Sequence, residues 1–224
     1  MFKAVLFDMD GVITDNREQD FRAWQKIFSN FDKDLDYAGY QSFLGMKGEE
    51  IVRSRINPEM SEEQASMWTK KKEAYFIKEI KDNKIETMQG LLNFLNNLKE
   101  NDIKIGLGTA AMEFKALAIL NELEIRDFFD VIICGEKVIN GKPDPETYLK
   151  GAEELGLQPD ECIVIEDAPN GIEAAKRAGM KCIAITSTHG REDLNEADMI
   201  IDSFDELNLA SLIICSDFQE NAER

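Results

Sequence analysis

Short apolar runs alternate with amphipathic stretches along most of the chain. Runs rich in β-branched residues are typical of buried strands, whereas apolar residues three or four positions apart indicate helices. The pattern predicts strands over Phe2–Phe7, Ile103–Leu107, Val131–Cys134, Cys162–Ile165, Cys182–Ile185 and Met199–Ile201, and helices over 88–100, 113–123, 145–155, 169–178 and 204–214. This alternation predicts an α/β fold, a Rossmann-like and mostly parallel sheet with helices on both faces.

Residues 16–84 break the alternation, because they show helical periodicity and no convincing strand. One helix-like run carries aromatic residues at helical spacing, and a second begins at Ser61-Glu62-Glu63-Gln64, a capping-box pattern. We therefore expect an α/β core of residues 1–15 and 85–224, with a small all-helical domain of residues 16–84 inserted after the first strand. We expect the aromatic residues to form the core of this insertion rather than to stack on a ligand: Phe21, Trp24, Phe28 and Phe31.

Composition and charge exclude several classes of protein. No apolar stretch approaches the ~20 residues that a membrane-spanning helix needs, and the N-terminal apolar run is too short for a secretory signal. The formal net charge of −18 disfavours binding to nucleic acid or to anionic membranes, which Lys and Arg dominate. We expect a cytoplasmic protein without nucleic-acid or membrane partners. A phosphorylated substrate would need a locally positive pocket.

The chain has four cysteines, Cys134, Cys162, Cys182 and Cys215, and three of them lie in apolar, strand-like runs. They show neither a C-x-x-C motif nor a metal-ligand spacing, so we expect reduced core residues. A disulfide pair or a nucleophilic thiol is the weaker alternative, since His189 is the only histidine available for a Cys–His pair.

The first predicted strand ends in two aspartates, Asp8 and Asp10, followed by Gly11. Two like charges this close repel each other unless a cation lies between them or one is protonated. A solvated acidic turn is the alternative interpretation of this segment. The apolar strand before it favours chemistry, because binding sites of parallel sheets lie at the carboxyl ends of the strands.

Three further signals follow other predicted strands or lie in loops of the core. Thr109 follows Ile103–Leu107 and precedes a helix, where a hydroxyl and backbone N–H groups suit a phosphate oxygen. Lys142 lies in a proline-punctuated loop, from which its charge could neutralise a phosphoryl group and a carboxylate. Glu166 and Asp167 end the strand Cys162–Ile165 and offer the hard oxygen ligands that Mg²⁺ prefers. Each signal alone also fits a solvated loop or turn.

Taken in this order, Asp8-Met9-Asp10-Gly11-Val12, Thr109, Lys142 in Gly-Lys-Pro-Asp-Pro, and Glu166-Asp167 resemble the four motifs of the haloacid dehalogenase superfamily. The resemblance covers nearly the whole chain, and the helical insertion is similar to that family's α-helical cap. The branch it resembles most is that of the β-phosphoglucomutase-like phosphatases. The resemblance specifies superfamily and mechanism well and the substrate poorly.

The resemblance implies a role for each motif residue. Asp8 would take the phosphoryl group as nucleophile, and Asp10 would act first as general acid and then as general base. Mg²⁺ would bind Asp8, the backbone carbonyl of Asp10 and Asp167, with Glu166 nearby. Thr109, the N–H of Ala110 and Lys142 would hold the transferring oxygens.

The resemblance leaves two activities open, a phosphatase and a β-phosphoglucomutase-type sugar-phosphate mutase. A mutase of this branch would carry an arginine where this chain has Gly48, and a polar Ser-Lys-Asn-like run where it has Ala110-Ala111-Met112-Glu113. Both are missing, so we expect a phosphatase acting on a small phosphorylated metabolite, as a monomer. Lys47 and Lys72 are candidate substrate contacts of the cap, although the run Lys70-Lys71-Lys72 fits a solvated helix face for two of its members.

Two rival functions come from other classes. Gly106-Leu107-Gly108-Thr109-Ala110-Ala111 fits a loose dinucleotide fingerprint, but it follows the second strand rather than the first. A non-catalytic protein that keeps the fold is the other rival, since fold alone does not confer function. Neither explains the paired aspartates as well as phosphoryl transfer does.

Overall fold

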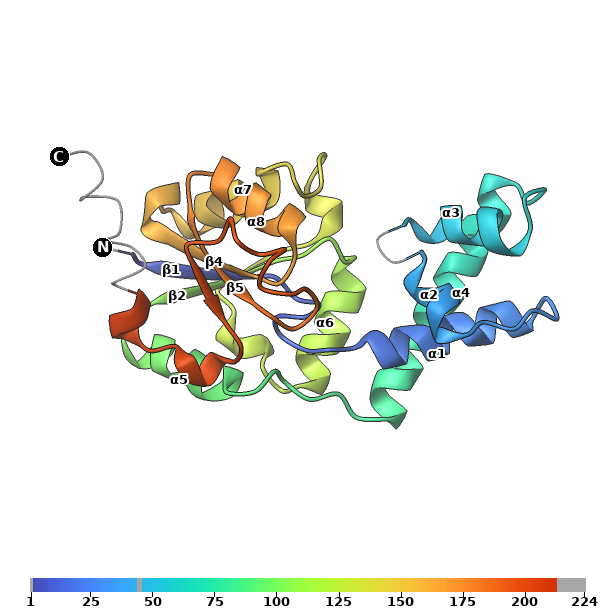
Figure 1. The fold of residues 1–224 in the computed structure, drawn as a ribbon, viewed down its shortest axis with the longest axis horizontal. Coiled ribbons are helices and arrows are strands. Elements are labelled where there is room, and N and C mark those ends of the chain that lie inside the picture. The colour runs from blue at the N-terminus through green and yellow to red at the C-terminus, as the bar shows by residue number, and fades with distance from the viewer. Residues whose placement is uncertain (1, 44–45, 213–224) are drawn as a thin grey trace. The chain divides into compact units, whose positions relative to one another are not determined.

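The computed structural model describes residues 2–43 and 46–212. Two compact units make up the chain, one of residues 1–15 and 86–224 and the other of residues 16–85 (Figure 1). Within the described residues, no helix is both long enough and apolar enough to cross a membrane. Leu44, Gly45, Cys215 and the last two residues of the predicted helix 204–214 lie outside the described residues.

The first unit contains a six-stranded, all-parallel sheet. Its strands are β1 Ala4–Phe7, β2 Lys104–Gly108, β3 Val131–Ile133, β4 Cys162–Glu166, β5 Lys181–Ile185 and β6 Met199–Ile201, in the spatial order β3-β2-β1-β4-β5-β6. The predicted α/β fold class is confirmed, and every predicted strand is present with ends shifted by up to two residues. Gly106 lies inside β2, as expected.

Among the described residues of this unit, four α-helices and three short 3₁₀ helices lie between these strands, and a fourth 3₁₀ helix follows the last strand. The α-helices are α5 Leu91–Glu100, α6 Glu113–Glu122, α7 Glu146–Leu155 and α8 Pro169–Arg177. The 3₁₀ helices are η2 Arg126–Phe128, η3 Gly135–Lys137, η4 Pro159–Glu161 and η5 Phe204–Glu206. The helix predicted over 204–214 is wrong at its start, because η5 ends at Glu206 and Leu207 is extended.

Burial on both faces of the sheet explains why the sequence of the central strand β1 is an unbroken apolar run. All four of its residues are buried, because helices cover both faces of the sheet (Figure 1). Leu6 packs in one cluster with Tyr148 of α7 and Ile172 of α8. Phe7 points to the opposite face, where its ring centroid lies 6.1 Å from those of Phe94 in α5 and Phe204.

The strand order places a switch point beside β1. The chain moves outward from β1 to β2 and β3, and then returns to place β4 on the other side of β1. Phe7 is in register with Leu107 of β2 and with Ile165 of β4. The residues that follow these strands therefore meet at one edge, where ligands bind in open α/β sheets.

The second unit is helical throughout its described residues. It contains α1 Arg17–Ser29, α2 Tyr37–Gln41, α3 Gly48–Ile51, the π-helical turn η1 Val52–Ile56, and α4 Glu62–Asp82. The predicted capping box is confirmed, since the N–H of Gln64 donates to Ser61 Oγ at 3.2 Å and the N–H of Ser61 donates to Gln64 Oε1 at 3.0 Å. These bonds satisfy amides that the first turn of α4 would otherwise leave unpaired.

The apolar side chains of this unit form its own core. Trp24 and Phe28 are buried beside Phe43, as predicted for a structural role, while Phe21 and Phe31 pack against the cluster from its edge. In the other unit Cys134, Cys162 and Cys182 are buried and free, which confirms the prediction of reduced core thiols for these three.

Candidate active site

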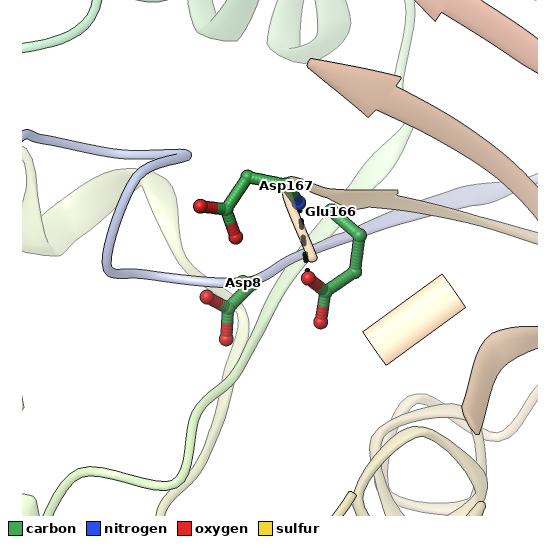
Figure 2. Close-up of side chains that lie close together, drawn as sticks. All are labelled: Asp8, Glu166 and Asp167. Atoms are coloured by element: carbon green, nitrogen blue, oxygen red, sulfur yellow. Dashed lines mark hydrogen bonds between the residues drawn. The ribbon is translucent and has the colours of Figure 1, made fainter. Parts of the chain in front are cut away.

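Three carboxylates converge at the switch point of the sheet. Asp8 follows β1, Glu166 ends β4, and Asp167 comes next in the chain (Figure 2). Each offers an oxygen that lies within 4.8 Å of the others. The backbone N–H of Asp8 donates to the carbonyl of Ile165 at 3.0 Å, so the sheet ladder continues into the site and fixes the position of Asp8.

Lys142 brings a positive charge into this cluster from the loop before α7. Its Nζ lies 2.6 Å from Asp8 Oδ1 and 2.6 Å from Glu166 Oε1, and donates to the carbonyl of Gly108 at 3.0 Å. The Lys142 side chain is 9% exposed. One buried lysine thus joins the ends of three neighbouring strands and faces two carboxylates.

Glu166 is the most firmly held of the three acids. Its Oε1 accepts from the hydroxyl of Tyr148 at 2.6 Å, and its Oε2 accepts from the N–H of Asp167 at 3.0 Å. Gly171, in the first turn of α8, makes room for this carboxylate, because a Cβ there would lie 1.8 Å from Glu166 Oε1. These contacts and Lys142 bind both carboxylate oxygens, so Glu166 is suited to organising the site.

The carboxylates carry more negative charge than Lys142 balances. Burial raises the pKa of Asp8 well above its usual value, and Glu166 and Asp167 raise it further against the opposing effect of Lys142. Burial and the charge of Glu166 raise the pKa of Asp167 to about 6. Burial opposes the charge of Lys142, but Asp8 and Glu166 outweigh it and raise the lysine pKa. Carboxylate oxygens that gather with an unbalanced charge fit a hard divalent cation.

Thr109 and Ala110 follow β2 at the same sheet edge. Thr109 is 2% exposed, and its N–H donates to the carbonyl of Ile133 at 2.9 Å. Its Oγ1 accepts from the N–H of Ala111 at 3.0 Å, which orients the hydroxyl within its own turn. Ala110 is exposed. The turn therefore presents a short polar segment between β2 and α6.

Asp10 lies outside the cluster of three acids. It pairs with Thr14 in an isolated β-bridge, and its side chain is 46% exposed, 3.9 Å from Lys115 Nζ. Gly11 turns the chain between Asp8 and Thr14 with φ +83°, a conformation that favours glycine. A Cβ at Gly11 would lie 2.1 Å from Asp167 Oδ2, so this turn requires glycine for space as well.

The two cap lysines occupy different environments. Lys47 is exposed and precedes α3. Lys72 is 4% exposed, forms an ion pair with Asp20, and lies 3.1 Å from Glu73 Oε1. Its Nζ lies 5.4 Å from the ring centroids of Trp24 and Phe76. Of its neighbours, Lys70 is exposed and Lys71 is half-buried.

Sequence reasoning missed Tyr148 and Thr188, which both contact the acidic cluster. Tyr148 lies in an amphipathic helix, where an aromatic residue resembles any core residue. Thr188 contacts Asp167 from the segment after β5. The rule that selected Asp8 and Glu166, polar residues just beyond the carboxyl end of a parallel strand, would have selected Thr188 as well.

Comparison with known proteins agrees with this geometry. A family model described as haloacid dehalogenase-like hydrolase matches residues 5–185. Validoxylamine A 7'-phosphate phosphatase of Streptomyces hygroscopicus subsp. limoneus is 30% identical over 207 residues, which cover 92% of this chain and 96% of that protein. β-Phosphoglucomutase of Bacillus subtilis is 33% identical over 216 residues, 94% of this chain and 93% of that protein.

A solved structure gives the same result in three dimensions. The crystal structure of β-phosphoglucomutase from Clostridium difficile superposes with a TM-score of 0.83 at 31% identity, and covers 97% of this chain and 98% of that one. The predicted resemblance and the predicted enzyme class, a phosphoric monoester hydrolase, are thereby confirmed. The chain belongs to the haloacid dehalogenase-like hydrolase family.

Proposed function

We propose that this protein is a Mg²⁺-dependent phosphatase that hydrolyses a small phosphomonoester, a sugar phosphate or similar metabolite, through an aspartyl-phosphate on Asp8. The observation that carries the proposal is the buried contact of Asp8 with Lys142 beside Glu166 and Asp167. It combines a carboxylate nucleophile, a fixed cation and a set of hard oxygen ligands at one sheet edge.

In the first step a carboxylate oxygen of Asp8 bonds to phosphorus, and the bond from phosphorus to the leaving oxygen breaks. The leaving oxygen takes the proton of the Asp10 carboxyl group. In the second step Asp10 accepts a proton from water, whose oxygen bonds to phosphorus. The bond between phosphorus and Asp8 then breaks and releases inorganic phosphate.

The side chains around Asp8 bind and orient the phosphoryl group. The Lys142 ammonium, the Thr109 hydroxyl and the Ala110 N–H offer donors to its oxygens. Asp8, Asp167 and the Asp10 carbonyl, with Glu166 beside them, would hold Mg²⁺, which offsets the repulsion between an anionic nucleophile and an anionic phosphate. The unbalanced charge of the cluster supports this donor set.

One contact at α6 favours hydrolysis over a mutase reaction. The first N–H of α6, that of Glu113, donates to both oxygens of Glu136, at 3.1 and 3.0 Å. A free helix N-terminus attracts phosphate, but here a carboxylate already occupies it, a few residues beyond Thr109. A mutase must hold a second phosphate, and this turn is negatively charged instead. The β-phosphoglucomutase relatives keep the mutase as the second candidate.

We assign the catalytic part to the unit of residues 1–15 and 86–224 and substrate selection to the helical unit of residues 16–85. Of the two candidate lysines, Lys47 is exposed and therefore available for such a role. Lys72 would have to exchange its ion pair with Asp20 before it could bind a substrate. Action as a monomer in the cytoplasm also remains a prediction.

A panel of phosphorylated metabolites, incubated with the enzyme and Mg²⁺, tests the proposal through released phosphate. We expect phosphate from a few sugar phosphates or related monoesters, and none after EDTA treatment until Mg²⁺ is restored. Asp8→Asn should lower turnover by at least about 10³-fold, since it removes the nucleophile. Substantial turnover by a folded Asp8→Asn variant would refute the mechanism.

The same panel distinguishes the mutase. β-Glucose 1-phosphate is incubated with glucose 1,6-bisphosphate, and glucose 6-phosphate is measured by a coupled assay. Glucose 6-phosphate without free phosphate would show a mutase and contradict the argument from Glu136.

A further inference from the structure

The segment that follows β5 reaches both turns that carry the acidic cluster. Ser187 Oγ donates to the carbonyl of Gly11 at 2.6 Å, and Thr188 Oγ1 contacts the carboxylate oxygen Oδ2 of Asp167. Thr188 Oγ1 also lies 3.1 Å from the Asp167 carbonyl, and His189 Nδ1 lies 3.0 Å from the same carbonyl. These three consecutive residues lie about twenty residues beyond Asp167 in the sequence, outside every motif that the family resemblance uses.

The proton count of this network assigns its direction. A carbonyl and an ionised carboxylate only accept, and the Thr188 hydroxyl has one proton to donate. Thr188 Oγ1 also lies 2.9 Å from His189 Nδ1. Because the Asp167 carboxylate is the charged acceptor among these partners, we assign the hydroxyl proton to its Oδ2. The Asp167 carbonyl is then satisfied by His189, which carries its proton on Nδ1. Thr188 thus fixes one oxygen of the carboxylate, while His189 fixes the backbone of the same residue.

Space at the site restricts Asp167 as well. A Cβ at Gly11 would lie 2.1 Å from Asp167 Oδ2 and 3.0 Å from the Cγ2 of Thr188, so the three residues are closely packed. Asp167 is 5% exposed. With one oxygen held by Thr188, the rotation of the carboxylate is restricted, and its other oxygen is directed by the same constraint.

From these contacts we propose that Thr188 is a positioning residue, which holds the Asp167 carboxylate in the orientation needed to bind the divalent cation. The inference rests on the proposed Mg²⁺ site and adds to it a residue that touches neither the phosphate nor the nucleophile. A carboxylate that is already oriented loses less conformational freedom when it binds a cation. Removing the hydroxyl should therefore lower the affinity for the metal rather than the stability of the fold. Partners of this kind typically contribute 10–100-fold to metal affinity, that is, about one to two powers of ten.

The test compares Thr188→Val, which keeps the shape and loses the hydroxyl, with Thr188→Ser, which keeps the hydroxyl. Thr186→Val is the matched control, because Thr186 Oγ1 donates to Asp202 Oδ1 at 2.6 Å, also threonine to aspartate, in the same segment. Mn²⁺ is the probe, since it shares the oxygen ligands of Mg²⁺. Titration of the full chain with Mn²⁺, followed by the electron paramagnetic resonance signal of the free ion, gives the dissociation constant without any substrate.

We expect Thr188→Val to raise the Mn²⁺ dissociation constant by about 10–100-fold, and Thr188→Ser and Thr186→Val to leave it within about threefold. The Mg²⁺ concentration for half-maximal phosphatase activity should follow the same order. Circular dichroism confirms folding, and Thr188→Ala replaces the valine variant if that variant unfolds.

Three results would overturn the inference. They are a Thr188→Val constant equal to that of the unmodified protein, an equal loss in Thr188→Ser, or no Mn²⁺ binding by the unmodified protein. Failure of the proposed function is separable, because it would appear as an unmodified protein that binds Mn²⁺ normally and releases no phosphate. The Thr188 variants would then still decide the positioning role.

Discussion

Replacing Lys142 by methionine tests how strongly the buried lysine stabilises the metal-free site. Methionine keeps an unbranched side chain of similar length and removes the charge. Asp8 Oδ1 and Glu166 Oε1, each 2.6 Å from Lys142 Nζ, then lose their cation. The Lys142 side chain is only 9% exposed, so water does not replace the lost charge. Removing one partner of a buried ion pair costs about 3–5 kcal/mol, because the other charge stays buried and uncompensated.

The loss of stability caused by Lys142→Met should depend on pH in a defined direction. The raised pKa of Asp8 means that the folded protein binds its proton more tightly than the unfolded chain does. With such a carboxyl group, the fold progressively loses stability as the pH rises from the unfolded pKa of about 4 to the folded pKa. Without Lys142 this effect grows, so the deficit of Lys142→Met should be largest at pH 7.5 and smaller at pH 5.

Urea denaturation in EDTA, followed by circular dichroism, measures the free energy of unfolding. We expect Lys142→Met to lose about 3–5 kcal/mol at pH 7.5, which is roughly 6–20 °C in melting temperature for a chain of this size. Lys137→Met is the matched control. Its lysine pairs with Glu154 at 3.4 Å with side chains 40% and 46% exposed, and surface pairs contribute about 0–1 kcal/mol. A Lys142→Met variant as stable as the control, or equally destabilised at both pH values, would refute the reasoning.

Three further predictions concern Gly171, Asp167 and Glu136. Gly171→Ala should lower phosphatase activity by at least about tenfold, because the new Cβ would collide with Glu166, 1.8 Å from Oε1, and displace a group that orders the site; unchanged steady-state kinetics would contradict this. Asp167→Asn should stabilise the metal-free protein at pH 7.5 by at most about 3 kcal/mol and hardly at all at pH 4, because the Asp167 pKa is raised to about 6 and each pKa unit corresponds to about 1.4 kcal/mol. Urea denaturation at the two pH values measures this difference, and stabilisation at pH 4 alone would contradict the predicted direction of the pH dependence. Glu136→Gln keeps an acceptor for the Glu113 N–H but removes a charge, so kcat/KM for a sugar bisphosphate relative to the monophosphate should rise, and a constant ratio would exclude Glu136 from substrate selection.

Local pattern was enough to predict the fold and the acidic edge of the site. Buried strands such as β1 and β4 need continuous apolar residues, and Asp8, Glu166 and Asp167 are polar groups at their carboxyl ends. Both signals are short-range, so they can be read before any contact is known. The capping box at Ser61 is local in the same sense, and it marked the start of α4 correctly.

The arrangement of charges, by contrast, was decided by tertiary contacts. Lys142 meets Asp8 across 134 positions in sequence, and Thr188 meets Asp167 from a loop beyond β5. Lys72 reads as one member of a charged run, yet it lies in the interior of the helical unit with Asp20. Residue type and spacing determine which chemical groups are present and on which element they lie. Which groups become neighbours, and how much water remains between them, depends on packing between distant segments, and it is this proximity and burial that set the pKa values and the metal-binding geometry of the site.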